Sequence, residues 1–212
     1  IVVIGDRNTS LNVDTVELDN YSAGMLVGRH MLGLGHRHIA FISTTLNNAN
    51  AIRIRRLDGV RAVYAQEENT SVQVFARDIT PLEELNDIGI EHRTGYELTM
   101  ECLKRSSGIS GIVAVNDFVA YGVLDALEEK GLKVPGDYSV CGFDNLSASR
   151  FWNVGLTSVE HHIEEKGRNA FTILYERMTG NSTPNNITRV EFSHHLLENR
   201  STAPFRQTSP QS

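Results

Sequence analysis

The sequence predicts an α/β fold with a doubly wound parallel sheet, and three observations support this class. Segments with the apolar patterns of strands alternate with segments whose apolar residues recur at helical spacing. The connections between them are short, as in parallel strands joined by crossover helices. The chain has 212 residues, of which 40% are hydrophobic, so it can bury a substantial core as one large domain or two small ones.

From residue 1 to residue 145, predicted strands and helices follow each other in turn. Strands are expected at 1–6, 38–43, 71–76, 110–117 and 137–145. Helices are expected between them, at 19–35, 53–69, 93–105 and 118–131. Asp19-Asn20 should cap the first helix and Gly35 should stop it, whereas Asp117 should cap the last helix and Gly131 follows its end.

The pattern changes after residue 145. An irregular stretch at 146–155 precedes a short strand at 156–161, a helix near 163–180 and a last strand around 187–198. A late helix and strand after a complete parallel unit indicate a second lobe that the chain revisits. The final residues, 205–212, have the polar composition of a disordered tail.

Composition argues against several classes of protein. A formal net charge of −6 argues against a chain that holds DNA by itself, because phosphate binding needs clustered Lys and Arg. No apolar run approaches the ~20 residues of a membrane span. The chain starts without Met on an apolar strand, so the lack of a leader pattern says little about secretion. Cys102 and Cys141 are expected to be buried free thiols, which suits a reducing cytoplasm.

Common enzyme signatures do not occur in the sequence. It has no G-x-S-x-G elbow, Walker A lysine loop or C-x-x-C pair, so we expect neither catalysis nor a cofactor. The glycine-rich run at 28–36 lies at a helix C-terminus, whereas a phosphate loop belongs at an N-terminus. In a strand, the neighbours in His161-His162 and in His194-His195 would point to opposite faces. Surface or hinge histidines are therefore favoured over metal ligands.

Polar side chains follow three of the predicted strands. Asp6 follows the first, Asn116 and Asp117 follow the fourth, and Asp144 and Asn145 follow the fifth. Because the carboxyl ends of parallel strands share one edge of a sheet, these side chains should converge across one crevice. Capping is the competing role; it is favoured for Asp117 and left open for Asn145. For Asp6, Asn116 and Asp144 we expect ligand contacts.

A basic cluster of Arg53, Arg55 and Arg56 opens the helix predicted at 53–69. A spacing of three places Arg53 and Arg56 on one helical face. We expect Arg56 to form a bidentate fork to a ligand hydroxyl pair or carboxylate, with a solvated basic face as the alternative. For Arg53 and Arg55 the solvated face is the favoured interpretation.

Several motifs, taken in order, resemble the LacI/GalR family of bacterial transcription regulators. They include VVIGDR, RRLDGV, NDFVAYG, GLKVPGDYSVCGFDN and LTSVEH, and the resemblance runs from residue 1 to about residue 204. It concerns the effector-binding domain, which is similar to periplasmic sugar-binding proteins: two α/β lobes joined by three crossovers, with a small ligand between them. It implies a partial N-terminal lobe at 1–17 and 161–190 and a nearly complete C-terminal lobe at 18–160 and 191–204.

The resemblance also implies which residues contact the effector. They are Asp6, Arg7, Arg56, Ile90, Asn116 and Asp144. Ile90 is a departure, because that position often holds an aromatic residue that stacks on the ligand. Val154-Gly155 replaces the usual Pro-Pro before the strand at 156–161. Phe151-Trp152 could supply the missing aromatic surface, or could pack against the lobe.

The function implied by the resemblance is ligand sensing without chemistry. A small metabolite, first a sugar and second a nucleobase, would bind between the lobes, and their closure in a homodimer would set operator affinity. Operator DNA would be bound by a headpiece that is absent from this chain. A solute-binding protein of a sugar transporter is the alternative, which a secretory leader would distinguish. An enzyme of the Rossmann type is the third interpretation.

Overall fold

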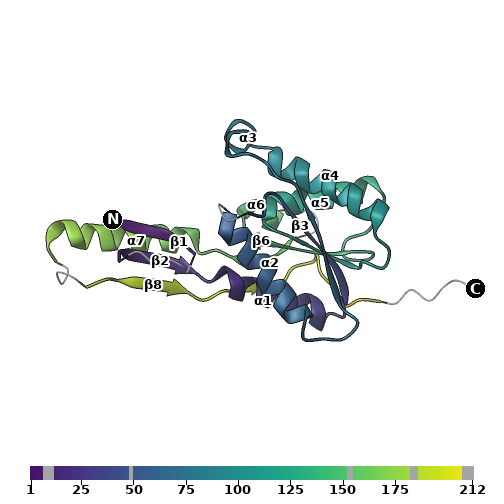
Figure 1. Ribbon diagram of the computed structural model, residues 1–212, viewed down its shortest axis with the longest axis horizontal. Coiled ribbons are helices and arrows are strands. Elements are labelled where there is room, and N and C mark those ends of the chain that lie inside the picture. Colours follow the sequence, from purple (N-terminus) through teal and green to yellow (C-terminus); the bar gives the residue numbers. More distant parts are fainter. Residues whose placement is uncertain (7–11, 48–49, 152–154, 182–185, 207–212) are drawn as a thin grey trace, which may run out of the picture.

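The computed structural model describes residues 1–6, 12–47, 50–151, 155–181 and 186–206, which form two separate β-sheets (Figure 1). The larger sheet has six strands and lies among most of the helices. The smaller sheet has three strands and lies beside one long helix. The two units lie end to end and give the molecule an elongated shape (Figure 1). The predicted α/β class with parallel sheets is confirmed.

The larger sheet is parallel except at one edge. Its strands, in spatial order, are β4 (Ser71–Ala76), β3 (His38–Ser43), β5 (Gly111–Ala114), β6 (Ser139–Asp144), β7 (Thr157–Glu160) and β9 (Leu196–Leu197). β9 pairs with β7 in the antiparallel direction. From β3 the chain moves to β4 on one side and then returns to β5 on the other side. Doubly wound sheets bind ligands outside the carboxyl ends of their strands at such a reversal.

Two pairs of helices cover the larger sheet. α1 (Asn20–Gly33) packs on α2 (Ala51–Tyr64), and α4 (Ile90–Arg105) packs on α5 (Asp117–Glu129). The two pairs lie on opposite sides of the sheet (Figure 1). This arrangement leaves the carboxyl edge of the strands open toward the smaller unit.

The core lies between the sheet and these helix pairs. Phe41 on β3 and Phe143 on β6 are the largest fully buried side chains, surrounded by Ile, Val and Leu from the neighbouring elements. Cys102 and Cys141 belong to the same core and are free, as predicted. Continuous apolar strands are expected where both faces of a parallel sheet are covered.

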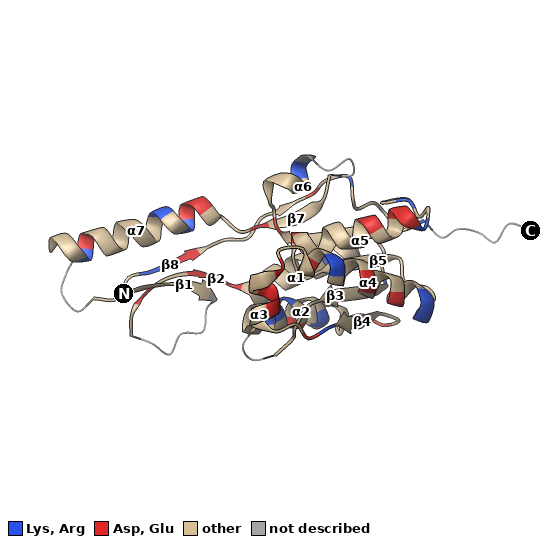
Figure 2. Cartoon of the chain, turned by 90° about the horizontal axis from the view of Figure 1, so that it is seen from above, with Lys and Arg blue, Asp and Glu red and all other residues tan. Residues whose placement is uncertain are grey.

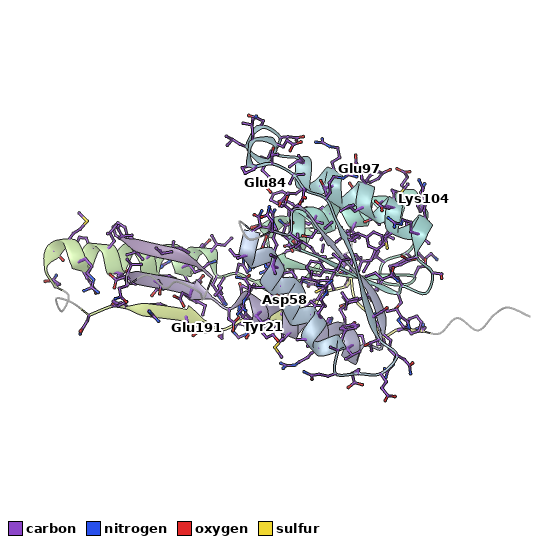
Figure 3. The ribbon with its side chains drawn as sticks, viewed as in Figure 1. Tyr21, Asp58, Glu84, Glu97, Lys104 and Glu191 are labelled. Carbon is purple, nitrogen blue, oxygen red and sulfur yellow. The ribbon has the colours of Figure 1, made fainter. Side chains whose placement is uncertain are left out.

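Glycine allows α1 and α2 to approach closely. A Cβ atom added at Gly24 would collide with the backbone carbonyl of Arg56, and one added at Gly59 would collide with that of Tyr21. Figure 3 labels Tyr21 on α1 and Asp58 on α2, on either side of this contact. The close packing holds α2, and with it Arg56, at a fixed position beside the sheet.

The smaller sheet consists of β1 (Val2–Asp6), β2 (Asp14–Leu18) and β8 (Arg189–Phe192), in that order and all parallel. α7 (Ile163–Thr179) packs against β1 and β2. Arg177 of α7 donates from Nε and Nη2 to the two carboxylate oxygens of Asp14, at 2.8 and 2.7 Å. This bidentate pair fixes the C-terminal part of α7 to the central strand.

β2 is a strand that was not expected from the apolar pattern of the sequence. All five of its residues are buried, although two of them, Asp14 and Glu17, are acidic. The Asp14 carboxylate is satisfied by Arg177 and by the backbone N–H of Thr188, which donates at 2.7 Å. Those partners lie more than a hundred residues away along the chain, so local composition concealed the strand.

Two short helices also lie where no helix was predicted. α3 (Pro81–Asn86) begins with a capping box in which Thr80 and Glu83 exchange hydrogen bonds. Its first residue is proline, which favours that position, so the signal for α3 was present in the sequence and was overlooked. α6 (Ser147–Phe151) lies inside the stretch predicted as irregular.

The single strand predicted around 187–198 is wrong. β8 and β9 are separate strands in different sheets, so the chain crosses between the units after Phe192. Residue 191 pairs with β2 of the smaller sheet, although the predicted boundary placed it in the other lobe. The remaining boundaries between the lobes stay a prediction.

The predicted helix ends are confirmed, but one predicted cap is wrong. Gly35 and Gly131 follow their helices with φ angles of 88° and 69°, in the left-handed region that glycine tolerates. At the start of α5 the cap is Asn116, whose Oδ1 accepts a hydrogen bond from the N–H of Val119 at 2.9 Å. Asp117, predicted as the cap, is the first residue of the helix.

The predicted tail begins with an ordered residue. The N–H of Phe205 donates to the carbonyl of Leu34 at 2.7 Å, and its ring lies 6.0 Å from that of His36. Residues 207–212 of the predicted tail lie outside the described residues.

Candidate functional site

A cavity of about 560 Å³ lies at the carboxyl ends of β5 and β6, where the larger unit meets α7. Its volume is in the range of small-molecule sites. It is lined by Asn50, Ala51, Ile52, Arg53, Arg56, Val115, Asn116, Asp144, Leu146, His161, Ile163 and Lys166. The structure therefore brings together Arg56, Asn116 and Asp144, which were predicted as ligand contacts.

Arg56 lies at the centre of the site, and its side chain is buried. Nε donates to Oδ1 of Asn20 at 3.0 Å, and Nη1 donates to the carbonyl of Val115 at 2.6 Å. Nη2 lies 3.3 Å from Oδ1 of Asp144 and 2.8 Å from Nε2 of His161. Each nitrogen of the guanidinium thus has a partner on a different element, so Arg56 connects α1 and α2 to the ends of three strands.

The guanidinium of Arg56 also lies over an aromatic ring. Its central carbon is 4.8 Å from the centroid of Phe143, within the range of a cation–π contact. Burial lowers the pKa of Arg56, and the carboxylate of Asp144 opposes this effect. Arg56 therefore remains charged, with one face of its planar group on Phe143 and its nitrogens held along the edge.

The backbone turns sharply at the end of β6. Asp144 has a φ angle of 111° and Asn145 a φ angle of 48°, which are uncommon for residues other than glycine. The N–H of Asn145 donates to Oγ of Ser158 at 3.0 Å and holds the turn. Strained backbone of this kind persists where the surrounding structure fixes it, and it is frequent at functional sites.

The Asp144 carboxyl group titrates in an unusual range. Burial raises its pKa to about 7, although the positive charge of Arg56 acts against this shift. The nearby carboxylates of Asp117 and Glu91 act in the same direction as burial. The site can therefore present either a carboxylate or a carboxylic acid to a ligand near neutral pH.

Asp117 supports the site from within the core, where it is fully buried. Its Oδ2 accepts hydrogen bonds from the N–H of Leu146 at 2.8 Å and from Oγ of Ser149 at 2.6 Å. Its Oδ1 accepts from Oγ of Ser158 at 2.7 Å. One carboxylate thus holds α6, β7 and the chain that follows Asp144, which fixes the direction of the Asp144 side chain.

A second network involves Arg53 and Asn116, which also line the cavity. Nη2 of Arg53 donates to Glu84 at 2.9 Å and to Glu91 at 3.0 Å. Glu91 also accepts from Nδ2 of Asn116, with both carboxylate oxygens at 2.9 Å. Figure 3 shows Glu84 on α3, at the edge of the larger unit. The interpretation of Arg53 as part of a solvated basic face was therefore wrong.

Ile90 does not line the cavity. It is the first residue of α4 and is partly buried, whereas its neighbour Glu91 reaches the site and holds Asn116. A polar residue one position along the helix thus takes part where an aromatic or apolar residue was expected. The structure brings no support for Ile90 as a ligand contact.

Other predicted contacts fall at or beyond the edge of what the structure describes. Arg7 lies outside the described residues, as do Trp152 and Val154. Asp6 ends β1 in the smaller sheet, where its backbone pairs with Leu18. Ligand contacts of Asp6 and Arg7 stay predictions.

Among the residues of the cavity that were not predicted as ligand contacts, His161 and Lys166 have side chains that can carry a positive charge. His161 follows β7 directly and contacts Arg56 and Asp144, with 13% of its side chain exposed. Of the predicted surface or hinge position, the structure rules out the surface, and His161 lies on the connection from β7 to α7. The rule that placed Asp144 at a strand end would have placed His161 there as well. Lys166 comes from the first turn of α7, and no local pattern in the sequence relates that turn to the larger sheet.

Comparison with known proteins places this chain in a family. The family model for the periplasmic binding protein-like domain matches residues 29–202. This chain belongs to that family. Family membership agrees with the two parallel sheets and with a cavity between the units that carry them.

Curated relatives of this periplasmic binding protein-like domain include transcriptional repressors. The HTH-type transcriptional repressor PurR of Haemophilus influenzae is 31% identical over 178 residues, which cover 84% of this chain and 50% of the repressor. The protein of the same name from Erwinia tasmaniensis is 32% identical over 196 residues, covering 91% and 53%. The chain thus spans about half the length of the curated relatives it matches.

Solved structures give the same result. A LacI family transcriptional regulator from Enterococcus faecium with bound ribose has a TM-score of 0.80 and 25% identity, covering 97% of this chain and 71% of that one. The transcriptional regulator CelR in complex with cellobiose has a TM-score of 0.73 and 25% identity, covering 93% and 58%. The resemblance to LacI-family regulators that the sequence predicted is confirmed.

No helix among the described residues has the length and apolar character that a membrane span requires. Within the same residues, no group of three or more His, Cys, Asp or Glu side chains is placed to hold a metal ion.

Proposed function

We propose that this chain is the effector-binding domain of a transcription regulator and that it binds a small metabolite without changing it chemically. The observation that carries the proposal is the cluster of Arg56, Asp144 and His161 at the strand ends, inside a cavity that α7 completes from the other unit. A ligand in this cavity contacts both units. It therefore favours the arrangement in which the units are closed on it.

A sugar is the first candidate ligand and a nucleobase is the second. The cavity combines a carboxyl group at Asp144 and amides at Asn50 and Asn116 with apolar side chains such as Ile52 and Leu146, a mixture that suits a small polar ring. The relatives solved with ribose and cellobiose support a sugar. The relatives named PurR support a purine.

Closure of the units would act on DNA through a homodimer. In that arrangement the angle between the units sets the spacing of two DNA-binding headpieces, and so the affinity for operator DNA. A coupling free energy of about 1–3 kcal/mol is sufficient. The absence of enzyme signatures from the sequence supports a domain that binds without catalysis. A regulator of this kind would work in the cytoplasm.

A thermal-shift screen of the full-length gene product tests the proposal. Sugars, sugar phosphates and nucleobases are added to the wild-type protein and to Asp144→Asn, a change that keeps the size of the side chain. Asp78→Asn is the matched control, because Asp78 is exposed and does not line the cavity. A ligand at 100 times its dissociation constant is expected to add about 2.7 kcal/mol of stability.

A shift with one compound class, lost in Asp144→Asn and kept in Asp78→Asn, would support the proposed site. No shift with any compound, or a shift that Asp144→Asn retains in full, would contradict it. Sequencing the native N-terminus separates the regulator from a solute-binding protein of a sugar transporter. A DNA-binding headpiece supports the regulator, and a secretory leader supports the transporter protein.

A further inference from the structure

We infer that the effector carries an anionic group, a carboxylate or a phosphate, which binds to Nζ of Lys166 on the α7 side of the cavity. The inference rests on the proposed function, because it names the ligand class of the same site. It starts from Lys166, a charged residue that lines the cavity and has no part in the networks described above.

Both arginines of the cavity are in direct contact with carboxyl groups. Arg56 faces Asp144, and Arg53 faces two carboxylates, those of Glu84 and Glu91. The backbone N–H of Lys166 donates to the carbonyl of His162, but its side chain has no hydrogen bond or ion pair with any residue in the described part of the chain. Among the described residues that line the cavity, Lys166 is the cation that no carboxylate contacts directly, so an anionic group of a ligand can take that place.

The environment of Lys166 makes an empty site unfavourable. Its side chain is partly buried, and burial lowers its pKa. The positive charge of Arg56 acts in the same direction, and the carboxyl group of Asp144 acts against it. A partly buried lysine beside an arginine is destabilising unless an anion joins it. Such a residue is more readily explained by binding than by folding.

The position of Lys166 gives the anion a defined place. Figure 2 shows the N-terminal end of α7 as the end nearest the larger unit, with acidic and basic residues in its first turns. Ile163 and Lys166 from this end line the cavity, whereas the acidic pair Glu164 and Glu165 is exposed to solvent. The anionic group would therefore contact the smaller unit, while the rest of the ligand contacts the strand ends of the larger one.

This arrangement predicts selection between neutral and charged ligands of the same shape. A charge-assisted hydrogen bond in a partly buried site changes affinity by about tenfold to a hundredfold. Because the bond spans the two units, the same group would also favour their closure. Ribose and ribose 5-phosphate form one matched pair of probes, and ribose and ribonate form a second pair that tests the carboxylate.

The experiment measures dissociation constants by calorimetry for these pairs, and for glucose with glucose 6-phosphate and gluconate. The full-length gene product is compared with Lys166→Met, which keeps length and removes charge, and with Lys166→Arg, which keeps charge. Lys104→Met is the control, since Lys104 is exposed on α4 and far from the cavity (Figure 3). We expect the anionic compound of a pair to bind about tenfold or more tightly than the neutral one in the wild type, in Lys166→Arg and in Lys104→Met. Lys166→Met is expected to lose that preference.

Three other results overturn the inference. If neutral members bind the wild type as tightly as anionic ones, Lys166 does not select an anion, although the proposed function stands. If Lys166→Met keeps the anionic preference, another residue provides it. If no probe of either kind binds, and the screen with Asp144→Asn also finds none, the proposed function fails together with the inference.

The melting temperature of the empty protein separates binding from a structural role. Removing an unpaired, partly buried charge is expected to leave the melting temperature of Lys166→Met equal to or above that of the wild type. A fall of several degrees would show that Lys166 stabilises the fold, and would overturn the inference.

Discussion

Nδ1 of His161 lies 3.0 Å from Oδ1 of Asp144, and this contact fixes the arrangement of protons in the site. The guanidinium of Arg56 approaches Nε2 of the same imidazole at 2.8 Å. An arginine only donates, so Nε2 must accept, and the neutral ring then carries its proton on Nδ1 and donates to Asp144. Burial and Arg56 agree with this assignment, since together they lower the pKa of His161 to about 2.

The pH dependence of stability is expected to contain two opposite contributions. The pKa of Asp144 is raised from 3.8 to about 7. Its contribution to the free energy of unfolding is therefore fully present below pH 3.8 and is lost as the pH rises toward 7. The pKa of His161 is lowered from 6.5 to about 2, so its contribution is present above pH 6.5 and is lost as the pH falls. Between pH 3.8 and pH 6.5, a rise in pH therefore lowers the stability through Asp144 and raises it through His161 in the wild type.

Substituting each partner should separate the two contributions. Asp144→Asn leaves His161, so the free energy of unfolding should rise with pH in that window. His161→Gln leaves Asp144, so the free energy of unfolding should fall. Each group contributes up to about 1.4 kcal/mol per pH unit. Urea denaturation at four pH values measures both slopes, and parallel profiles for the two variants would contradict the assignment.

Asp117→Asn is expected to destabilise the protein by about 2–4 kcal/mol. An amide places a donor where Ser149, Ser158 or Leu146 also donates, so buried donors lose their acceptor. Asp125→Asn is the control, because that carboxylate is 38% exposed and should change stability by less than about 1 kcal/mol. Urea denaturation measures both variants, and equal effects would mean that Asp117 does not hold the strand ends.

Gly122→Ala is expected to destabilise the protein by about 1–3 kcal/mol or more, because the added methyl group would collide with the backbone carbonyl of His92. Gly33→Ala is the matched helical control, with no atom within 4 Å of the added Cβ. There alanine should stabilise the helix by several tenths of a kcal/mol to about 1 kcal/mol. Melting temperatures distinguish the two, and a stabilising Gly122→Ala would contradict the close packing of α4 on α5.

Arg56→Lys is expected to reduce both stability and effector binding. A lysine cannot reach Asn20, Val115 and Asp144 together, so buried acceptors lose their donors, at a cost of about 1–3 kcal/mol each. Arg61→Lys, at an exposed position on the same helix, should leave both properties unchanged. Urea denaturation and the ligand-induced thermal shift test this. Wild-type values for Arg56→Lys would mean that the hydrogen bonds of the Arg56 guanidinium are dispensable.

Much of the fold was predictable because its signals are local. The alternation of apolar strands and amphipathic helices gave the α/β class, and glycines such as Gly35 and Gly131 marked helix ends. The polar ends of β5 and β6 gave Asn116 and Asp144. β2 escaped prediction because its acidic residues are neutralised by partners distant along the chain, above all by Arg177.

The sequence by itself determined the class of fold, the edge of the sheet that carries the site, and the resemblance to LacI-family regulators. The fold class and the sheet edge follow from the apolar periodicity of the segments and their order along the chain. The resemblance follows from motifs such as NDFVAYG and GLKVPGDYSVCGFDN. Only the tertiary structure decided that Arg53 faces carboxylates, that His161 joins Arg56 and Asp144, and that Lys166 reaches the cavity from α7. Those contacts join segments distant along the chain. Their protonation and charge balance depend on burial and on distance, which no single segment contains.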